Sequence, residues 1–303
     1  MRRRTFLAIG GAGVGAAALG GAWAATDTAP RGPGGGDAPE GGGPGSGRTP
    51  GEVPDVPAGR VETHRVASRA RSAVPRLITM VPHGIGARQA RELPVCVVLH
   101  PRDSSARGMV GLGMPQFLTA AVRSGVPPFA LAAVDGGQDS YWHAIGRNDP
   151  QEMLLEELPG WLGEAGLGLP DDGVPRAALG ISMGGYGSLV YARRRRTLDA
   201  VAVLSPALFR SWEAARTYGP FPDRRDWEGT EPLRHVDDLG IDAAGLGVWC
   251  GRQDPFHRAA REFAARSGAA VGEFTDGAHD PGYWRAVMPR ALEFVGRRLA
   301  GDQ

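Results

Sequence analysis

Short apolar segments alternate with longer amphipathic segments along most of the chain after residue 60. Several apolar segments are continuous, which is typical of strands buried on both faces in a mostly parallel sheet. The pattern predicts strands at 61–68, 76–82, 94–100, 129–135, 176–182, 199–205, 245–251 and 269–275. It predicts helices at 114–124, 150–166, 184–196, 255–268 and 283–300.

This alternation of strands and helices predicts the fold class. Parallel strands joined by crossover helices form a doubly wound α/β sheet, with helices on both faces. The segment 206–244 departs from the alternation, because it is rich in aromatic, charged and proline residues. We therefore expect one α/β domain at 60–303, with an insertion at 206–244 between two strands.

The first 59 residues differ from the rest of the chain. Arg3 and Arg4 precede a Gly- and Ala-rich stretch, and "AWA" at 22–24 has the form of a cleavage site. Residues 1–25 are therefore predicted to be a twin-arginine export signal, with an uncleaved membrane anchor as the alternative. Residues 26–59 are rich in Gly and Pro, which predicts a disordered linker. The mature protein is expected to be secreted or extracytoplasmic.

Charge and cysteine content bear on the expected binding partners and on the expected disulfide state. The formal net charge is +1, so it does not indicate a nucleic-acid or anionic-membrane partner. Four arginines at 193–196 fall in the last turn of a predicted helix, where cations complement the helix dipole. Cys96 and Cys250 lie in strands that this fold would place about 14 Å apart. We therefore predict two free, buried thiols.

The strongest chemical signal is "GISMG" at 180–184. It has the G-x-S-x-G form, follows a predicted buried strand and precedes a predicted helix. This context is typical of a strained strand-to-helix turn that lifts a serine above the sheet edge at a helix N-terminus. Side chains at 180 and 184 would collide with neighbouring elements. Ser182 is therefore the candidate nucleophile, and the alternative is a glycine-rich turn with an inert serine.

A serine nucleophile needs a histidine base. Three histidines follow Ser182 in the sequence. His279 follows the last predicted strand and precedes the last helix, whereas His257 falls inside a helix and His235 precedes a strand. His279 is therefore the candidate base.

The histidine in turn needs an acid that orients it. Asp254 follows the preceding strand by a short turn and is the candidate for this role. Its alternative role is that of an ordinary helix N-cap. Asp276 and Asp280 are further candidates, but they lie so near His279 in sequence that reaching its outer ring nitrogen is awkward.

Two backbone N–H groups are expected to bind the oxyanion that forms on the substrate. Met183 N–H directly follows the nucleophile and is the first. The second should come from the loop after the strand that ends at His100. Pro101 has no N–H, so Arg102 N–H is the candidate.

The loop at 134–150 should lie on the same edge as Ser182, because it also follows a strand. Its aromatic side chains either line an acyl or alcohol pocket or pack the loop against the domain. His100, at the end of the strand predicted at 94–100, also has two interpretations. It is either a substrate contact or a structural residue at the base of the following loop. The candidates for substrate contact are His100, Tyr141, Trp142, His143 and Trp284.

With these residues in place, the domain resembles the α/β-hydrolase superfamily. The supporting stretches are "VDGGQDSYW", "EELPGWL", "LGISMGGYGSL", "VWCGRQDP" and "GAHDPGYW". Within the superfamily it is similar to the putative-esterase branch, which contains esterase D and the secreted actinobacterial mycolyltransferases. The resemblance implies a serine acyl-enzyme mechanism on esters or thioesters, without a cofactor. It supports the roles given above to Ser182, Asp254, His279, Met183 and Arg102.

Two positions depart from the pattern of that branch. Pro101 stands where the oxyanion loop commonly begins with Gly, and Asp254 stands where the mycolyltransferases carry Glu. Both departures weaken the case for a long-chain mycolyl substrate and leave ester chemistry intact.

The sequence therefore predicts a secreted serine esterase that acts on a small-molecule or lipid ester. We expect no cofactor, no metal and no stable membrane insertion after signal cleavage. One alternative is a cell-envelope acyltransferase that moves the acyl group to a sugar hydroxyl. The other is a non-catalytic cell-surface binding protein of the same fold.

Overall fold

A computed structural model describes residues 51–167, 175–219 and 221–301. The described residues all belong to one compact unit, Gly47–Gln303. The predicted export signal at 1–25 and the predicted linker as far as residue 50 lie outside the described residues, so these two expectations remain predictions.

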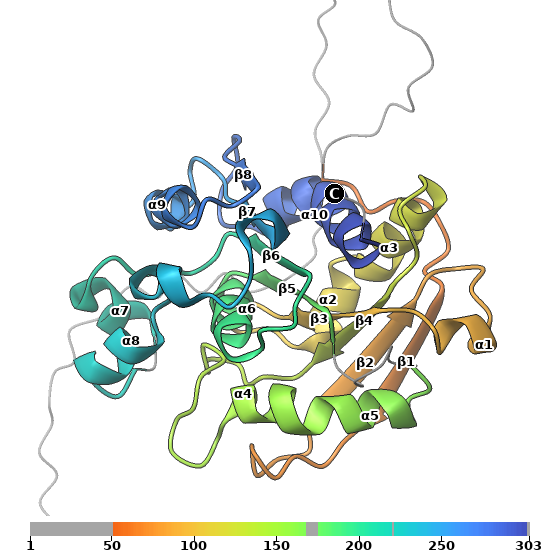
Figure 1. The fold of residues 1–303 in the computed structure, drawn as a ribbon, viewed down its shortest axis with the longest axis horizontal. Coiled ribbons are helices and arrows are strands. Elements are labelled where there is room, and N and C mark those ends of the chain that lie inside the picture. Colours follow the sequence, from red (N-terminus) through yellow and green to blue (C-terminus); the bar gives the residue numbers. More distant parts are fainter. Residues whose placement is uncertain (1–50, 168–174, 220, 302–303) are drawn as a thin grey trace, which may run out of the picture. The chain divides into compact units, whose positions relative to one another are not determined.

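An eight-stranded sheet forms the centre of this unit (Figure 1). The strand order is β1-β2-β4-β3-β5-β6-β7-β8, with antiparallel pairing of β1 with β2 and of β2 with β4, and parallel pairing elsewhere. The strands are β1 Arg60–Arg65, β2 Arg76–Val81, β3 Val95–Leu99, β4 Ala130–Val134, β5 Ala177–Ile181, β6 Ala200–Leu204, β7 Leu246–Trp249 and β8 Val271–Glu273.

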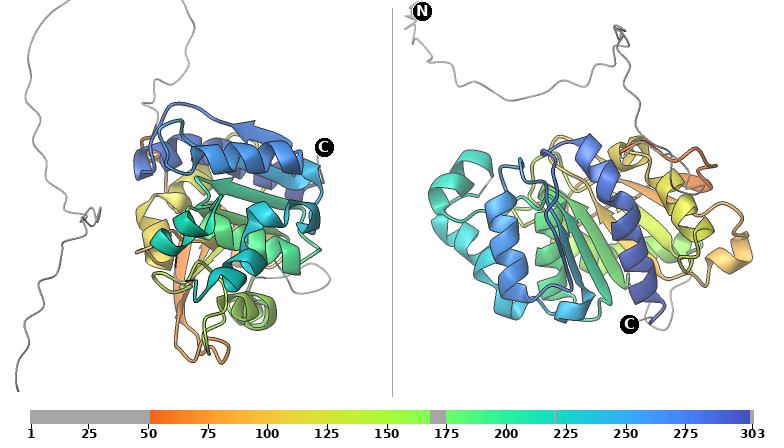
Figure 2. Two further views of the ribbon diagram at one scale, coloured as in Figure 1. Left: turned by 90° about the vertical axis from the view of Figure 1, so that its left-hand side faces the viewer. Right: turned by 90° about the horizontal axis from the view of Figure 1, so that it is seen from above.

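Helices cover both faces of the sheet, as the sequence predicted (Figure 2). One face packs against α2 (Ala106–Gly111), α3 (Met114–Arg123) and α10 (Pro281–Leu299). The other face packs against α5 (Leu158–Glu164), α6 (Met183–Arg194) and α9 (His257–Ser267). There are also two short helices: α1 (Ala87–Ala90) between β2 and β3, and α4 (Pro150–Glu152) after β4. The fold is the mostly parallel, doubly wound α/β-hydrolase fold.

The order of the strands positions the site. Strand β3 lies between β4 and β5, so the crossover connections run in opposite directions on its two sides. In open parallel sheets a crevice forms at such a point, beyond the carboxyl ends of the strands. Every residue of β3, β4, β5 and β6 is buried, which explains their continuous apolar sequences. The edge strand β1 instead alternates between half-buried and exposed residues.

The helix predicted at 150–166 is present but irregular. A π-helix at Met153–Glu157 (η1) separates α4 from α5. Pro159, within the first turn of α5, has no N–H to donate to a carbonyl of the preceding turn, so the regular hydrogen-bond pattern is interrupted there.

The insertion between β6 and β7 is confirmed. It contains α7 (Trp212–Tyr218), α8 (Arg224–Thr230) and three short 3-10 helices, η2 (Pro232–Arg234), η3 (Val236–Asp238) and η4 (Ala243–Gly245). Figure 1 shows α7 and α8 beyond α6, at one side of the sheet. The strand–helix pattern did not predict α7 or α8, because these short helices are stabilised by packing on the domain rather than by a periodic sequence.

Residues 51–59, which the sequence analysis assigned to the linker, instead lie against the domain. Pro54 is buried. A Cβ atom added to Gly113 would meet the Val53 side chain at 2.7 Å, and one added to Gly51 would meet the Gly282 carbonyl oxygen at 2.9 Å. The prolines and small residues that suggested disorder here follow a surface path over the starts of α3 and α10.

Cys96 in β3 and Cys250 after β7 are free and buried, as predicted. Their strands lie three positions apart in the sheet. No helix in the described part of the chain has the length and apolar character needed to span a membrane.

Candidate active site

The turn from β5 to α6 places Ser182 at the carboxyl edge of the sheet. Ser182 has φ of 55° and ψ of −116°, a conformation that side-chain-bearing residues adopt only under strain. A Cβ atom at Gly180 would lie 2.0 Å from the Gly184 carbonyl oxygen, and one at Gly184 would lie 1.9 Å from the Leu99 carbonyl oxygen. The two glycines are therefore needed for the close approach of the turn to its neighbours.

Three side chains from distant parts of the sequence meet at this turn. The Ser182 Oγ atom lies 2.8 Å from His279 Nε2. The other ring nitrogen, His279 Nδ1, lies 2.8 Å from Asp254 Oδ2. Ser182 is 6% exposed and Asp254 is 4% exposed, whereas the His279 side chain is 24% exposed. The ring is therefore reachable from solvent, while its acid partner is shielded.

Asp254 is held in place by both of its carboxylate oxygens. Oδ2 faces His279, and Oδ1 accepts a hydrogen bond of 2.8 Å from the Phe256 N–H. Burial raises the pKa of Asp254, but the hydrogen bond and charge of His279 and the Phe256 N–H outweigh it. The net pKa lies below the usual value, so the carboxyl group is ionised at neutral pH. The helix α9 begins only at His257, so Asp254 is not its N-cap residue.

The other two acidic candidates have different partners. Asp276 pairs with Arg252 at 3.2 Å. Asp280 is the N-cap of α10 and accepts a hydrogen bond of 3.0 Å from the Tyr283 N–H. Neither residue is the acid that contacts His279 in this structure.

Two hydrogen bonds join the loop of the acid to the loop of the histidine. The Gln253 side-chain oxygen accepts from the Gly277 N–H at 2.7 Å, and the Gln253 N–H donates to the Gly277 carbonyl at 3.0 Å. Gly277 has φ of 151°, and a Cβ atom at Gly251 would lie 2.1 Å from the Gly277 carbonyl oxygen. Gln253 was not among the residues predicted from the sequence. Its only signal was its place directly before Asp254.

The expected oxyanion donors lie at the start of α6 and in the loop after β3, which meet at Gly184. Met183 is the first residue of α6, and the first N–H groups of a helix have no acceptor within the helix. The loop after β3 passes close by, because a Cβ atom at Gly184 would also meet the His100 carbonyl oxygen at 2.8 Å. This loop carries Arg102, whose side chain pairs with Asp139 at 3.0 Å. The roles of the Met183 and Arg102 N–H groups remain predictions.

His100 has the structural role at the loop base that was the alternative to substrate contact. It is 1% exposed, and burial lowers its pKa to about 4, so the ring is neutral. Its Nε2 accepts from the Gly136 N–H at 3.0 Å, which leaves the proton on Nδ1 to donate to the Pro101 carbonyl at 2.8 Å. The ring thereby joins the loops after β3 and β4.

Tyr141, Trp142 and His143 also differ from the expectation that they line a substrate pocket. They are at most 2% exposed. Trp142 lies on Gly136 and Gly187, where an added Cβ would meet the Trp142 side chain at 2.4 and 2.3 Å. The alternative, a loop packed against the domain by its own aromatic residues, is correct. Sequence alone gives no indication of whether an aromatic residue in a loop faces inward or outward.

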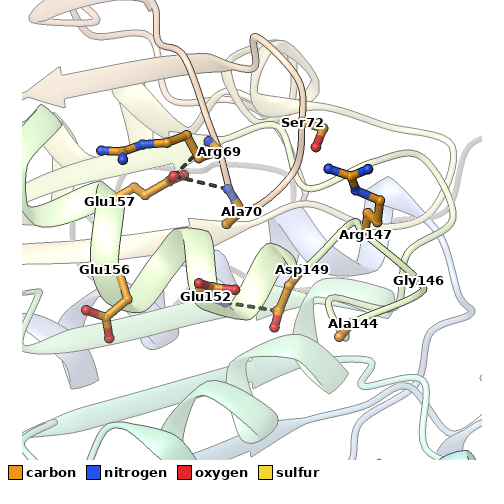
Figure 3. A pocket seen from close by; sticks show the side chains of 10 residues that line it. All are labelled: Arg69, Ala70, Ser72, Ala144, Gly146, Arg147, Asp149, Glu152, Glu156 and Glu157. Carbon is orange, nitrogen blue, oxygen red and sulfur yellow. Dashed lines mark hydrogen bonds between the residues drawn. The ribbon is translucent and has the colours of Figure 1, made fainter.

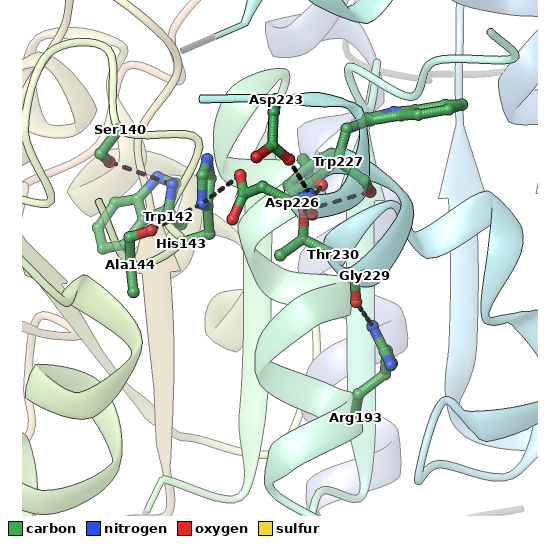
Figure 4. A network of polar contacts seen from close by, with 11 residues as sticks. Ser140, Trp142, His143, Ala144, Arg193, Asp223, Asp226, Trp227, Gly229 and Thr230 are labelled. Atoms are coloured by element: carbon green, nitrogen blue, oxygen red, sulfur yellow. Dashed lines mark hydrogen bonds and ion pairs between the residues drawn. The ribbon is translucent and has the colours of Figure 1, made fainter. Parts of the chain in front are cut away.

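His143 connects this loop to the insertion (Figure 4). Its ring stacks on Phe221 at 5.0 Å between centroids, and its Nδ1 lies 3.7 Å from Asp226 Oδ2 in α8. Burial lowers the pKa of His143 and raises the pKa of Asp226. A second contact between the insertion and the domain is the hydrogen bond from Tyr186 of α6 to Thr230 at 2.9 Å.

Two aromatic rings flank the half-buried His279. Trp284 of α10 lies at right angles to the His279 ring, with 5.4 Å between centroids. Phe256 lies on another side at 5.3 Å. Trp284 is 7% exposed and also packs in the hydrophobic core on the α10 face of the sheet. Its role in substrate contact remains a prediction.

A cavity of about 580 Å³ lies on another part of the surface (Figure 3). Neither Ser182, Asp254 nor His279 lines it. Glu157 at its wall accepts hydrogen bonds from the Arg69 and Ala70 N–H groups, so this carboxylate holds the loop between β1 and β2. The residues that line the cavity are Arg69, Ala70, Ser72, Ala144, Gly146, Arg147, Asp149, Glu152, Glu156 and Glu157.

Comparison with known proteins assigns the chain to a family. Residues 125–295, more than half of the chain, match the family described as "Putative esterase". No curated protein matches the chain. The fold and the family together define the protein as a serine hydrolase of the α/β-hydrolase fold. More narrowly, the chain belongs to this esterase family.

Solved structures show the same fold at low sequence identity. A ferulic acid esterase has a TM-score of 0.65 and 18% identity, over 79% of this chain and 98% of that chain. An S-formylglutathione hydrolase from Agrobacterium tumefaciens has a TM-score of 0.56 and 16% identity, over 79% and 94%. The MPT51 protein of Mycobacterium tuberculosis has a TM-score of 0.56 and 18% identity, over 78% and 99%.

Proposed function

We propose that this protein is an exported serine esterase that cleaves carboxylic esters or thioesters through an acyl-enzyme. The observation that carries the proposal is the unbroken contact from Ser182 Oγ through the two nitrogens of His279 to Asp254, at 2.8 Å for each step. Nucleophile, base and orienting acid in this order are the arrangement that acyl transfer by serine requires.

In the first half of the reaction, Ser182 Oγ attacks the acyl carbon and its proton passes to His279 Nε2. Asp254 stabilises the imidazolium that forms. In this proposal the Met183 and Arg102 N–H groups donate the hydrogen bonds that stabilise the oxyanion. The bond to the leaving alcohol or thiol then breaks, and His279 returns the proton to that group.

In the second half, water enters the site and loses a proton to His279 as it attacks the acyl carbon. The bond to Ser182 Oγ breaks, and the serine regains its proton from the ring. The free acid leaves, and the site returns to its starting state.

Hydrolysis of p-nitrophenyl acetate tests the proposal. Ser182→Ala should lower kcat by at least about 1,000-fold and should abolish labelling by a fluorophosphonate probe. Ser124→Ala is the matched control, because Ser124 is an exposed serine at the end of α3. Equal rates for Ser182→Ala and the unaltered protein would disprove the mechanism. A folded protein that the probe never labels would favour the non-catalytic alternative.

The export part of the proposal rests on the Arg3–Arg4 pair and on the small residues at 22–24. The full chain is expressed in a host with a working twin-arginine pathway and in a matched host without one. We expect extracytoplasmic protein only in the first host, and much less of it when both arginines are changed to lysine. Equal export from both hosts would contradict the assignment.

A further inference from the structure

A row of aromatic rings leads away from the base. Phe256 packs on His279 with 5.3 Å between ring centroids. Tyr218, at the end of α7, packs on Phe256 at 5.9 Å. Phe209 lies behind both, at 5.7 Å from Phe256 and 6.1 Å from Tyr218. We call Phe209, Tyr218 and Phe256 the aromatic wall.

The wall begins at the reacting centre and ends in solvent. The Tyr218 side chain is 47% exposed, and it is the one aromatic residue among the large exposed hydrophobic residues in the described part of the chain. Phe256 is half-buried. Phe209 is 2% exposed and supports the other two rings. Phe256 and Tyr218 therefore form a continuous series of ring contacts from His279 to a solvent-exposed side chain.

Hydrogen bonds fix the wall from behind. The Phe256 N–H donates to Asp254 Oδ1, the same carboxylate that orients His279. The Phe209 N–H donates to the buried Glu231 carboxylate at 3.2 Å. The backbones of Phe256 and Phe209 are thus each hydrogen-bonded to a buried acid.

We propose that the aromatic wall is a binding site for an aromatic ring of the ester, so that the protein prefers esters that carry an aryl group close to the reacting carbonyl. This inference rests on the proposed esterase function. Ring–ring contacts with offset or edge-to-face geometry add to the effect of buried area, and a saturated ring of similar size lacks this contribution. The aryl group belongs to either the acyl or the alcohol part of the ester, and the two are separated below.

Matched ester pairs test the proposal. Methyl hydrocinnamate and its cyclohexyl analogue place the ring on the acyl side. Benzyl acetate and cyclohexylmethyl acetate place it on the alcohol side. We expect kcat/KM to favour the aryl member of one pair by roughly 2- to 12-fold, the range that ring–ring contacts provide. The pair that shows the preference identifies the part of the ester that meets the wall.

Variants of Tyr218, the exposed residue of the aromatic wall, test whether the wall causes the aryl preference. Tyr218→Leu removes the ring but keeps an apolar side chain, and the aryl-to-cyclohexyl ratio should fall toward one. Tyr218→Phe keeps the ring, and the ratio should be retained. Since Tyr218 is half-exposed, both variants are expected to fold, which thermal unfolding checks. A ratio near one for both pairs in the unaltered protein, or a ratio unchanged in Tyr218→Leu, would overturn the proposal.

A binding measurement separates this inference from the esterase proposal. Hydrocinnamate, benzyl alcohol and their saturated-ring analogues are titrated against Ser182→Ala by calorimetry, and the same ratio is read from the Kd values. Tighter binding of an aryl compound that Tyr218→Leu removes supports the wall even if no ester is cleaved. Ester cleavage without any aryl preference in rate or binding contradicts the aryl-binding proposal and leaves the esterase proposal intact.

Discussion

Glu231 is a buried carboxyl group whose ionisation should destabilise the protein. It is fully buried at the end of α8. Its Oε2 accepts from the Phe209 N–H at 3.2 Å and from the Trp227 indole N–H at 3.1 Å, and its Oε1 accepts from the Leu233 N–H at 3.2 Å. Burial nevertheless dominates, and it raises the pKa from 4.5 to about 8.

The raised pKa determines the direction of the pH effect. Between pH 4.5 and about 8 the unfolded carboxyl is ionised while the folded one keeps its proton. Unfolding therefore releases a proton, and rising pH favours the unfolded state. Each pH unit in this window lowers the free energy of unfolding by about 1.4 kcal/mol. Because the slope is smaller near each end of the window, Glu231 should destabilise the protein by about 3.5 kcal/mol between pH 5 and pH 8.

Glu231→Gln isolates this contribution, because glutamine is neutral at every pH used. Its amide oxygen can accept the Phe209 and Trp227 donors, but its NH₂ group then faces the Leu233 N–H. This mismatch should cost about 1–3 kcal/mol at pH 5. The variant should therefore be less stable than the unaltered protein at pH 5 and more stable at pH 8 and above.

Urea unfolding at pH 5, 6, 7, 8 and 9 measures the effect. The quantity of interest is the difference in free energy of unfolding between Glu231→Gln and the unaltered protein at each pH, since other titrating groups contribute equally to both. A difference that stays constant over this range would refute the reasoning. It would show that the three hydrogen bonds keep Glu231 ionised in the folded state.

Three further changes test the site itself. Asp254→Asn should lower kcat by roughly 10⁴-fold with the fold retained by circular dichroism, because the amide no longer enforces the required histidine tautomer. Gly184→Ala should destabilise the protein by at least about 3 kcal/mol in urea unfolding, since its Cβ would lie 1.9 Å from the Leu99 carbonyl oxygen. The control Gly111→Ala, a helical position with nothing within 4 Å, should be neutral or stabilising. Gln253→Ala should lower kcat about tenfold with little change in KM in steady-state assays, because the histidine loop loses a hydrogen bond that positions it.

The strands and the three reacting side chains could be predicted because their signals are local. A continuous apolar run indicates a buried parallel strand, and chain order then limits which residues follow strand ends. Ser182, Asp254 and His279 were selected by this rule, and the structure brings them into contact. The backbone strain at Ser182 was also predictable, because its flanking glycines allow the tight turn.

The direction of side chains in loops could not be predicted in the same way. Trp142 was expected near the substrate, but its side chain lies between Gly136 of the same loop and Gly187 of α6 and is fully buried. Gln253 was missed because its partner Gly277 is 24 residues away and contributes only backbone atoms. In both cases the deciding contact is long-range, and neither residue belongs to a pattern that periodicity or composition can detect.

The contacts of the insertion indicate whether it moves. His143 meets Asp226 from the loop after β4, Tyr186 meets Thr230 from α6, and Glu231 ties α8 to the segment that leaves β6. These contacts hold α8 at three separate points, and the charged or polar groups involved are largely buried. Opening the insertion would expose them together with the aromatic rings packed between. We therefore expect the insertion to form a fixed wall of the site, so that substrate preference depends on which rings it presents rather than on a closing step.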